Sequence, residues 1–171
     1  MIRTILTYPN PELKKKSAPV VVINDGVREL VRDLAETMYA APGVGLAAPQ
    51  IGIHQRVIVM DVAPKGEPPN LIVAINPVIT YSEGESFEEE GCLSVLQYAA
   101  NVRRHARIIV KGLDLEGNEQ TWKADELLAI AFQHEIDHLE GILFVDHLSP
   151  LKRDLFKRRA RRLAETGTDT P

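Results

Sequence analysis

Two histidines four residues apart, with a glutamate directly after the first, carry the clearest chemistry in this chain. The motif reads His134-Glu135-Ile136-Asp137-His138. On an α-helix, side chains at i and i+4 lie on one face, so both imidazoles can reach one metal ion. Glu135 would then flank the ion, where a carboxylate can take a proton from activated water and pass it to a leaving group. The alternative is two surface histidines on an ordinary helix.

The residues before this motif favour the metal site. The run 127–132 is apolar throughout, with Asp125 placed as an N-cap and Gly141 as the residue that ends the helix. Such a helix is expected to be buried on every face. Two imidazoles and a carboxylate are costly to bury unless something satisfies them, and a metal ion does so directly.

A third protein ligand is needed, and Cys92 is the best candidate. It is the single cysteine of the chain, so no internal disulfide is available to it. A thiolate is a strong ligand for Zn²⁺ or Fe²⁺, and three protein ligands leave one position open for catalysis. The side-chain amide of Gln50 and the backbone N–H of Leu93 are candidate donors to an oxyanion. The alternative for a lone cysteine is packing as a small hydrophobe.

The elements that must position these residues follow from periodicity. Residues 1–23 are expected to form an extended arm, and a helix capped by Asn24 or Asp25 continues to about residue 42. Apolar runs at 57–60, 71–75 and 107–110 predict strands, and a hairpin turn at 115–118 leads into a further segment at 120–122. The glycine-rich segment 43–52 allows unusual backbone angles and close approach by another chain. The acidic run 83–90 is interpreted mostly as a solvated face.

A last helix is predicted from Ser149 and Pro150. Its expected apolar side is Leu151, Leu155, Phe156 and Leu163. Its other face is basic, through Lys152, Arg153, Lys157, Arg158, Arg159, Arg161 and Arg162. This face can meet RNA phosphates or an acidic surface, or it can simply be solvated. The end of the chain, from about residue 165 to 171, is expected to be disordered.

Together these elements predict an α+β fold in which mixed or antiparallel strands pack around a central metal-binding helix, flanked by a long N-terminal and a C-terminal helix. A length of 171 residues with 44% apolar residues predicts one domain over 1–171. The net charge of −4 argues against a DNA-binding protein. No stretch predicts a membrane span or a signal peptide, so we expect a cytoplasmic protein without membrane partners.

Three segments resemble the signature motifs of bacterial peptide deformylases, in the family's order and spacing. They are Gly-Val-Gly-Leu-Ala-Ala-Pro-Gln at 43–50, Glu-Gly-Cys-Leu-Ser at 90–94 and Gln-His-Glu-Ile-Asp-His-Leu-Glu-Gly at 133–141. The resemblance implies removal of the N-formyl group from the initiator methionine of nascent polypeptides, with release of formate. By position it implies a metal held by Cys92, His134 and His138, with Glu135 as acid and base and with Gln50 and the Leu93 amide as oxyanion donors. It also implies one divalent ion, Fe²⁺ in the cell, with Zn²⁺ or Ni²⁺ accepted.

The resemblance extends to substrate and partner. It implies that peptide lies extended against Gly43 to Gly45 and past Gly91, as an added strand. Its methionine would enter an apolar pocket, for which Val44, Ile130 and Ala131 are the candidates. The basic last helix resembles that of family members whose C-terminal helix contacts the ribosome.

A supporting polar network and one departure complete the predicted site. Glu90, Arg104 and Asp137 are expected to orient the ligand segments, because charge near a metal must be satisfied. The family pattern continues after motif two with a hydrophobic residue and a proline, whereas this chain has Leu96 in the proline's place. That departure is expected to alter the loop beside the substrate cleft.

Two rival functions remain open on sequence alone. A zinc peptidase also uses a His-Glu-x-x-His helix, but no downstream glutamate or histidine supplies its usual third ligand, and His147 lies close to the helix end. A non-catalytic ribosome-associated protein would hold a structural metal, which usually has four protein ligands, and only three good ones are present. Cleavage of an internal bond in an unformylated peptide would favour a zinc peptidase. A protein that keeps its function when Glu135 is replaced would favour the structural metal.

Overall fold

The computed structural model describes residues 1–166 and contains two antiparallel sheets and three α-helices. One sheet has five strands in the order β1-β2-β3-β6-β7, and the other is the hairpin β4-β5. The strands are β1 Gly45–Ala47, β2 Val57–Met60, β3 Ile72–Glu83, β4 Ser86–Cys92, β5 Val95–Arg104, β6 Arg107–Leu113 and β7 Glu119–Asp125. The helices are α1 Asp25–Ala40, α2 Glu126–Leu139 and α3 Pro150–Thr166, with 3₁₀ turns η1 Pro11–Lys14, η2 Ala48–Ile51 and η3 Phe144–His147. The predicted α+β class is confirmed.

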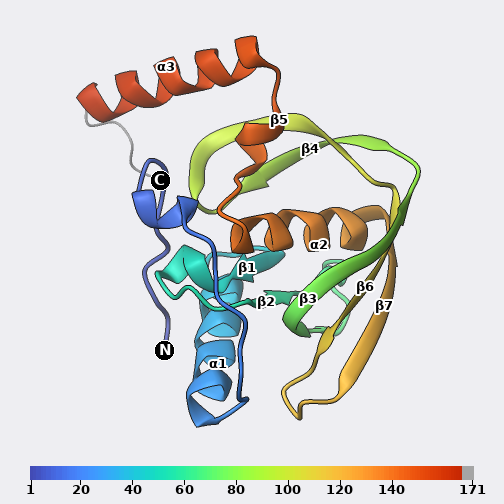
Figure 1. Ribbon diagram of the computed structural model, residues 1–171. Coiled ribbons are helices and arrows are strands. Elements are labelled where there is room, and N and C mark those ends of the chain that lie inside the picture. Colours follow the sequence, from blue (N-terminus) through green and yellow to red (C-terminus); the bar gives the residue numbers. More distant parts are fainter. Residues whose placement is uncertain (167–171) are drawn as a thin grey trace.

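Helix α2 lies at the centre, between the five-stranded sheet and the β4-β5 hairpin (Figure 1). Its apolar residues pack with Ile58, Met60 and Ile108 of that sheet, which buries most of the helix. The expected burial on every face is wrong at Leu127, which is 49% exposed. Asp125 occupies the N-cap position but its side chain makes no capping hydrogen bond.

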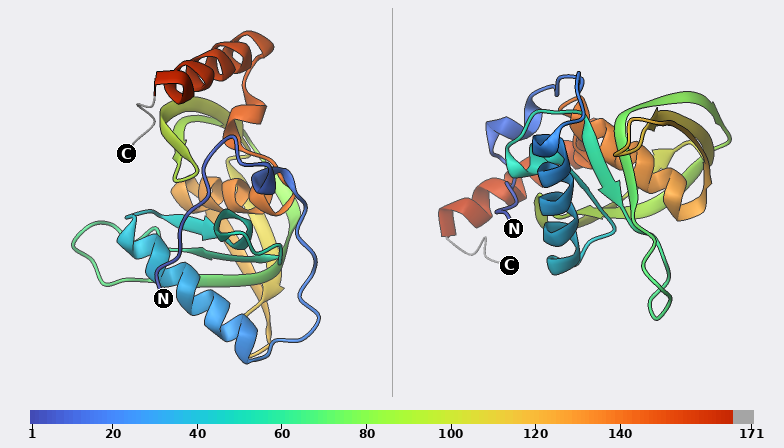
Figure 2. Two further views of the ribbon diagram at one scale, coloured as in Figure 1. Left: turned by 90° about the vertical axis from the view of Figure 1, so that its left-hand side faces the viewer. Right: turned by 90° about the horizontal axis from the view of Figure 1, so that it is seen from below.

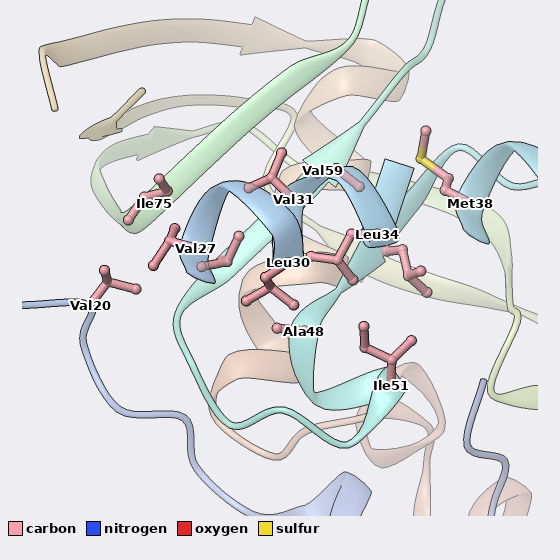
Figure 3. Close-up of a cluster of buried hydrophobic side chains, with 12 residues drawn as sticks. Val20, Val27, Leu30, Val31, Leu34, Met38, Ala48, Ile51, Val59 and Ile75 are labelled. Atoms are coloured by element: carbon pink, nitrogen blue, oxygen red, sulfur yellow. The ribbon is translucent and has the colours of Figure 1, made fainter. Parts of the chain in front are cut away.

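Strand β2 is apolar throughout because both of its faces are covered. Val57 and Val59 join the cluster under α1, whereas Ile58 and Met60 join the cluster under α2, as the alternation of side chains along a strand requires. Helix α1 begins where Asn24 accepts a hydrogen bond from the Val27 amide, so the predicted cap is confirmed. Figure 3 shows the apolar face of this helix, including Val27, Leu30, Val31, Leu34 and Met38, directed into the cluster.

The hairpin β4-β5 was not predicted as strands. Its first strand carries the acidic run, whose side chains are mostly exposed, so no apolar alternation marks it. The strand predicted at 71–75 also continues further than expected, because β3 bends at Asn76 (φ 53°) and then pairs with β6. The Asn76 side chain bonds both backbone groups of Val20, which fastens the N-terminal arm to this bend.

Helix α3 stands beside the hairpin, at the end of the molecule opposite α1 (Figure 2). Of its predicted apolar side, Phe156 is buried and Leu163 partly so, whereas Leu151 and Leu155 are 69% and 52% exposed. Residues 165 and 166, expected in a disordered tail, lie within α3, and the rest of that predicted tail is outside the described residues. None of the helices in residues 1–166 is long and apolar enough to cross a membrane.

Gly141 ends α2 with a φ of 74°, and a Cβ there would overlap the Lys14 carbonyl oxygen. Gly66 has a similar φ of 91° but open space around it. Both glycine-to-alanine changes incur the left-handed backbone cost of about 1 to 2 kcal/mol. We therefore expect Gly141→Ala to lower the urea midpoint of unfolding clearly more than Gly66→Ala. Equal urea midpoints for the two variants would show that the N-terminal arm around Lys14 moves aside at no cost in stability.

Candidate metal centre

Three side chains that can ligate a metal converge from two elements. The Cys92 sulfur at the end of β4 and the imidazoles of His134 and His138 on α2 offer ligand atoms that all lie within 4.8 Å of one another. The Cys92 Sγ and His138 Nε2 atoms are 3.4 Å apart. The helical spacing aligns the two histidines as predicted, and a bulge after Gly91 ends the pairing of β4 at the cysteine. A thiolate with two imidazoles is a donor set that suits a divalent transition metal.

Glu90 fixes the orientation of His134. Its Oε1 atom lies 3.0 Å from His134 Nδ1. Because an ionised carboxylate only accepts hydrogen bonds, Nδ1 must carry a proton, which leaves Nε2 as the nitrogen that can ligate a metal when the ring is neutral. Burial opposes ionisation of Glu90, but the hydrogen bonds from Arg104 and His134 outweigh it and lower its pKa.

Arg104 of β5 neutralises this carboxylate. Its Nε and Nη2 atoms donate to the two oxygens of Glu90 at 2.8 and 3.0 Å, and its Nη1 donates to Asp137 at 2.6 Å. Both Arg104 and Glu90 have side chains only 4% exposed. The structure therefore brings together all three residues of the predicted network.

Glu135, the predicted acid and base, lines the same cleft as Cys92 and His134. Its Oε1 atom is buried and has no hydrogen-bond partner within the described part of the chain. Burial raises the pKa of Glu135 to about 7, against an opposing effect from His134. Burial also lowers the pKa of His138, which favours the neutral ring that can ligate. An unpaired buried oxygen beside three ligand atoms is what a site built for a further charged group would show.

Gln50 presents its amide to the same cluster. The Ala47 N–H donates to Gln50 Oε1 at 2.9 Å, so the amide orientation is settled and Nε2 faces the cysteine. That Nε2 donates to Ser94 Oγ at 3.0 Å and lies 3.7 Å from Cys92 Sγ. Leu93 lies between these residues and lines the cleft.

Several supporting residues were missed on sequence. Ser94 receives the Gln50 amide, and its presence in the Glu-Gly-Cys-Leu-Ser segment was the available signal. The N-terminal arm also supports the site, because the amides of Leu6 and Tyr8 donate to the carbonyls of Gln50 and Ser94, both at 2.7 Å. No local pattern in an arm of this kind indicates such a distant contact.

The cluster opens into a cleft of about 430 Å³. All five residues predicted to contact substrate lie on its walls: Val44, Gly45, Gly91, Ile130 and Ala131. The exposed Leu127 lies there as well, which explains why an apolar residue of α2 reaches the surface. Leu96 does not line this cleft; it lines a separate groove beside α3.

Comparison with known proteins identifies the family. The family model described as polypeptide deformylase matches residues 2–154. This chain belongs to the peptide deformylase family. It is 51% identical over 158 residues to the peptide deformylase of Thermodesulfovibrio yellowstonii, covering 92% of this chain and 96% of that one.

Solved structures of the family share the fold. The crystal structure of a peptide deformylase from Legionella pneumophila has a TM-score of 0.90 at 42% identity, with 100% of both chains covered. The peptide deformylase from Ehrlichia chaffeensis in complex with actinonin has a TM-score of 0.88 at 39% identity, with 94% of this chain and 96% of that one covered. Family membership makes this chain an enzyme of the class that removes N-formyl groups.

Adjacent arginines of β5 give a matched test of the buried network. Arg104→Met leaves Glu90 buried without its cation, a change that costs about 3 to 5 kcal/mol in comparable sites. Arg103 instead pairs with Glu85 at the surface, where both side chains are mostly exposed. We expect Arg104→Met to lower the urea midpoint of the metal-free protein strongly and Arg103→Met to leave it near that of the wild type. Similar midpoints for the two variants would refute the assigned role of Arg104.

Proposed function

We propose that this chain is a metal-dependent hydrolase that removes the N-formyl group from the initiator methionine of nascent polypeptides and releases formate. The observation that carries the proposal is the convergence of a Cys, His, His donor set with an unpaired Glu135 oxygen in one cleft. A zinc peptidase shares the His-Glu-x-x-His helix but takes its third ligand from a downstream glutamate or histidine and not from a cysteine. A structural metal site is normally closed by four protein ligands, and the described residues offer three at this point.

One divalent metal ion completes the site in this proposal. Cys92, His134 and His138 would hold it, and the bound ion would act as a Lewis acid on the attacking water and the formyl oxygen. We propose Fe²⁺ in the cell, with Zn²⁺ or Ni²⁺ also accepted, since thiolate and imidazole ligands suit all three.

The protein's own groups then divide the work of hydrolysis. Glu135 takes a proton from the water that attacks the formyl carbon and later gives it to the departing amine. Gln50 Nε2 and the Leu93 N–H hold the oxygen on which negative charge develops. The Ala47 N–H fixes the Gln50 amide before substrate arrives, so this donor needs no reorganisation.

Substrate selection rests on the shape of the cleft. A peptide strand would lie along Gly43 to Gly45 and past Gly91, with its methionine against Val44, Ile130 and Ala131. A Cβ at Gly45 would lie 2.6 Å from Glu135 Oε2, so the wall and the carboxylate are already in close contact. A formyl group fits beside such a wall, and a bulkier acyl group would clash.

Glu135→Gln is the experiment that tests the proposal. Loss of the acid and base should lower formate release from a formyl-methionyl peptide about 10²- to 10⁴-fold, with metal content unchanged. Anaerobically purified protein, metal analysis and a formate assay provide the measurement. Glu88→Gln, an exposed change on β4, is the matched control and should retain full activity.

Each alternative outcome has a distinct meaning. Retained formate release by Glu135→Gln would favour a structural metal, and cleavage of an internal bond in an unformylated peptide would favour a zinc peptidase. We propose that the cleft also binds actinonin, as the Ehrlichia chaffeensis protein does in its solved complex. Binding of actinonin by Glu135→Gln would show that the cleft of the inactive variant is intact.

We further propose that the reaction takes place in the cytoplasm on chains at the ribosome, with α3 as the contact. The exposed α3 residues Lys152 and Arg162 form no ion pair within residues 1–166. Lys152→Glu with Arg162→Glu should weaken ribosome binding and reduce its salt dependence by about one ion per residue. Lys65→Glu with Lys123→Glu, elsewhere on the surface, makes the same charge change and should leave binding intact. Equal binding by both double variants would contradict a contact through α3.

A further inference from the structure

His147 lies at the outer end of a chain of contacts that reaches the metal-ligand cluster. Its Nε2 atom is 2.8 Å from Asp137 Oδ2, and that same oxygen accepts from Arg104 Nη1 at 2.6 Å. Arg104 grips both oxygens of Glu90, and Glu90 Oε1 contacts His134 Nδ1 at 3.0 Å. His147 was not expected to be a metal ligand, and it contacts Asp137 at the outer end of this chain of contacts.

Hydrogen-bond chemistry fixes how His147 joins this chain. Its Nε2 faces a carboxylate oxygen, which accepts only, so this nitrogen carries the proton and donates to Asp137. Arg104 Nη1 lies 3.4 Å from the same nitrogen, but both are donors and cannot bond each other. The two donors instead converge on one oxygen of Asp137 from different elements.

Side-chain exposure decreases from His147 through Asp137 to Arg104 and Glu90. The His147 side chain is 37% exposed and that of Asp137 21%, whereas those of Arg104 and Glu90 are 4% exposed. His147 therefore stands between water and the Asp137 oxygen. Without the imidazole, water can compete for that oxygen and weaken its hydrogen bond with Arg104. Arg104 would then be held less firmly in the position from which it donates to Glu90.

The turn that carries His147 also touches His134 directly. Phe144, at the other end of η3, stacks on the His134 ring with centroids 6.1 Å apart and an interplanar angle of 26°. The turn η3 thus acts on His134 in two ways. Phe144 packs against the face of its ring, and His147 acts on its Nδ1 atom through Asp137, Arg104 and Glu90.

We propose that His147 is a positioning residue that slows metal loss by holding His134 in its ligating orientation through Asp137, Arg104 and Glu90. The inference rests on the proposed metal site and adds a residue to it. Outer partners of metal ligands typically contribute 10- to 100-fold to metal affinity or activity. Because His147 acts through three other residues, we expect its loss to have an effect at the lower end of this range, about tenfold.

The test compares residues at position 147 whose side chains place a hydrogen-bond donor at different distances from the backbone. The amide nitrogen of glutamine can stand where Nε2 stands, whereas that of asparagine matches Nδ1 and falls short of Asp137. Zinc-loaded His147→Gln should release zinc to a chelating dye near the wild-type rate, whereas His147→Asn and His147→Ala should release it about tenfold faster. His105→Ala is the matched control, since within residues 1–166 only the backbone groups of His105 make hydrogen bonds.

Zinc release is measured without substrate, so its outcome is independent of whether formyl peptides are cleaved. Zinc release at the wild-type rate from both His147→Asn and His147→Ala would overturn the proposal. So would zinc release from His147→Gln that is accelerated as much as from His147→Asn, provided that the two variants have the same melting temperature. If the alanine variant does not fold, the comparison of glutamine with asparagine still decides the question. Metal release from His147→Asn that is faster than from His147→Gln supports it.

Discussion

The contact between the buried Glu90 carboxylate and His134 Nδ1 is the interaction on which the rest of the site depends. A carboxylate so deeply buried stays ionised only when donors surround it. Arg104 from β5 supplies two of them and His134 from α2 supplies the third. Strands β4 and β5 and helix α2 therefore meet at one side chain, and Cys92, two residues further along β4, is brought to the histidines by the same arrangement.

The five-stranded sheet gives this arrangement a firm base. Because β2 is covered on both faces, α1 and α2 pack on opposite sides of it, and each stabilises the surface on which the other lies. Short β1 forms the edge of that sheet, where Gly45 comes against Glu135. Helix α1 contributes no residue to the cleft, yet its packing determines where the wall of the cleft stands.

The sequence predicted what depends on local spacing. The histidine pair, the face of α1 and the short apolar strands are set by periodicity, and the three motifs identified most of the cleft. The hairpin β4-β5 escaped prediction because its strands are defined by pairing with each other and by one buried ion pair, neither of which leaves an apolar pattern. Leu127 and Leu151 were expected to be buried because of their residue type, and tertiary context left both exposed. Ser94 and the arm act through long-range backbone contacts that no window of sequence contains.

The glycines of segment 43–52 show which of two expected physical reasons applies at each position. The sequence indicated unusual backbone angles and close approach by another chain, and of Gly43, Gly45 and Gly52 only Gly52 has a positive φ, of 84°. A Cβ at Gly43 would lie 2.7 Å from Leu93 Cδ1, and one at Gly45 would meet the Glu135 carboxylate. A side chain at either position would therefore have to displace Leu93 or the Glu135 carboxylate. The absence of side chains at these two positions lets the wall of the cleft lie directly against Leu93 and Glu135.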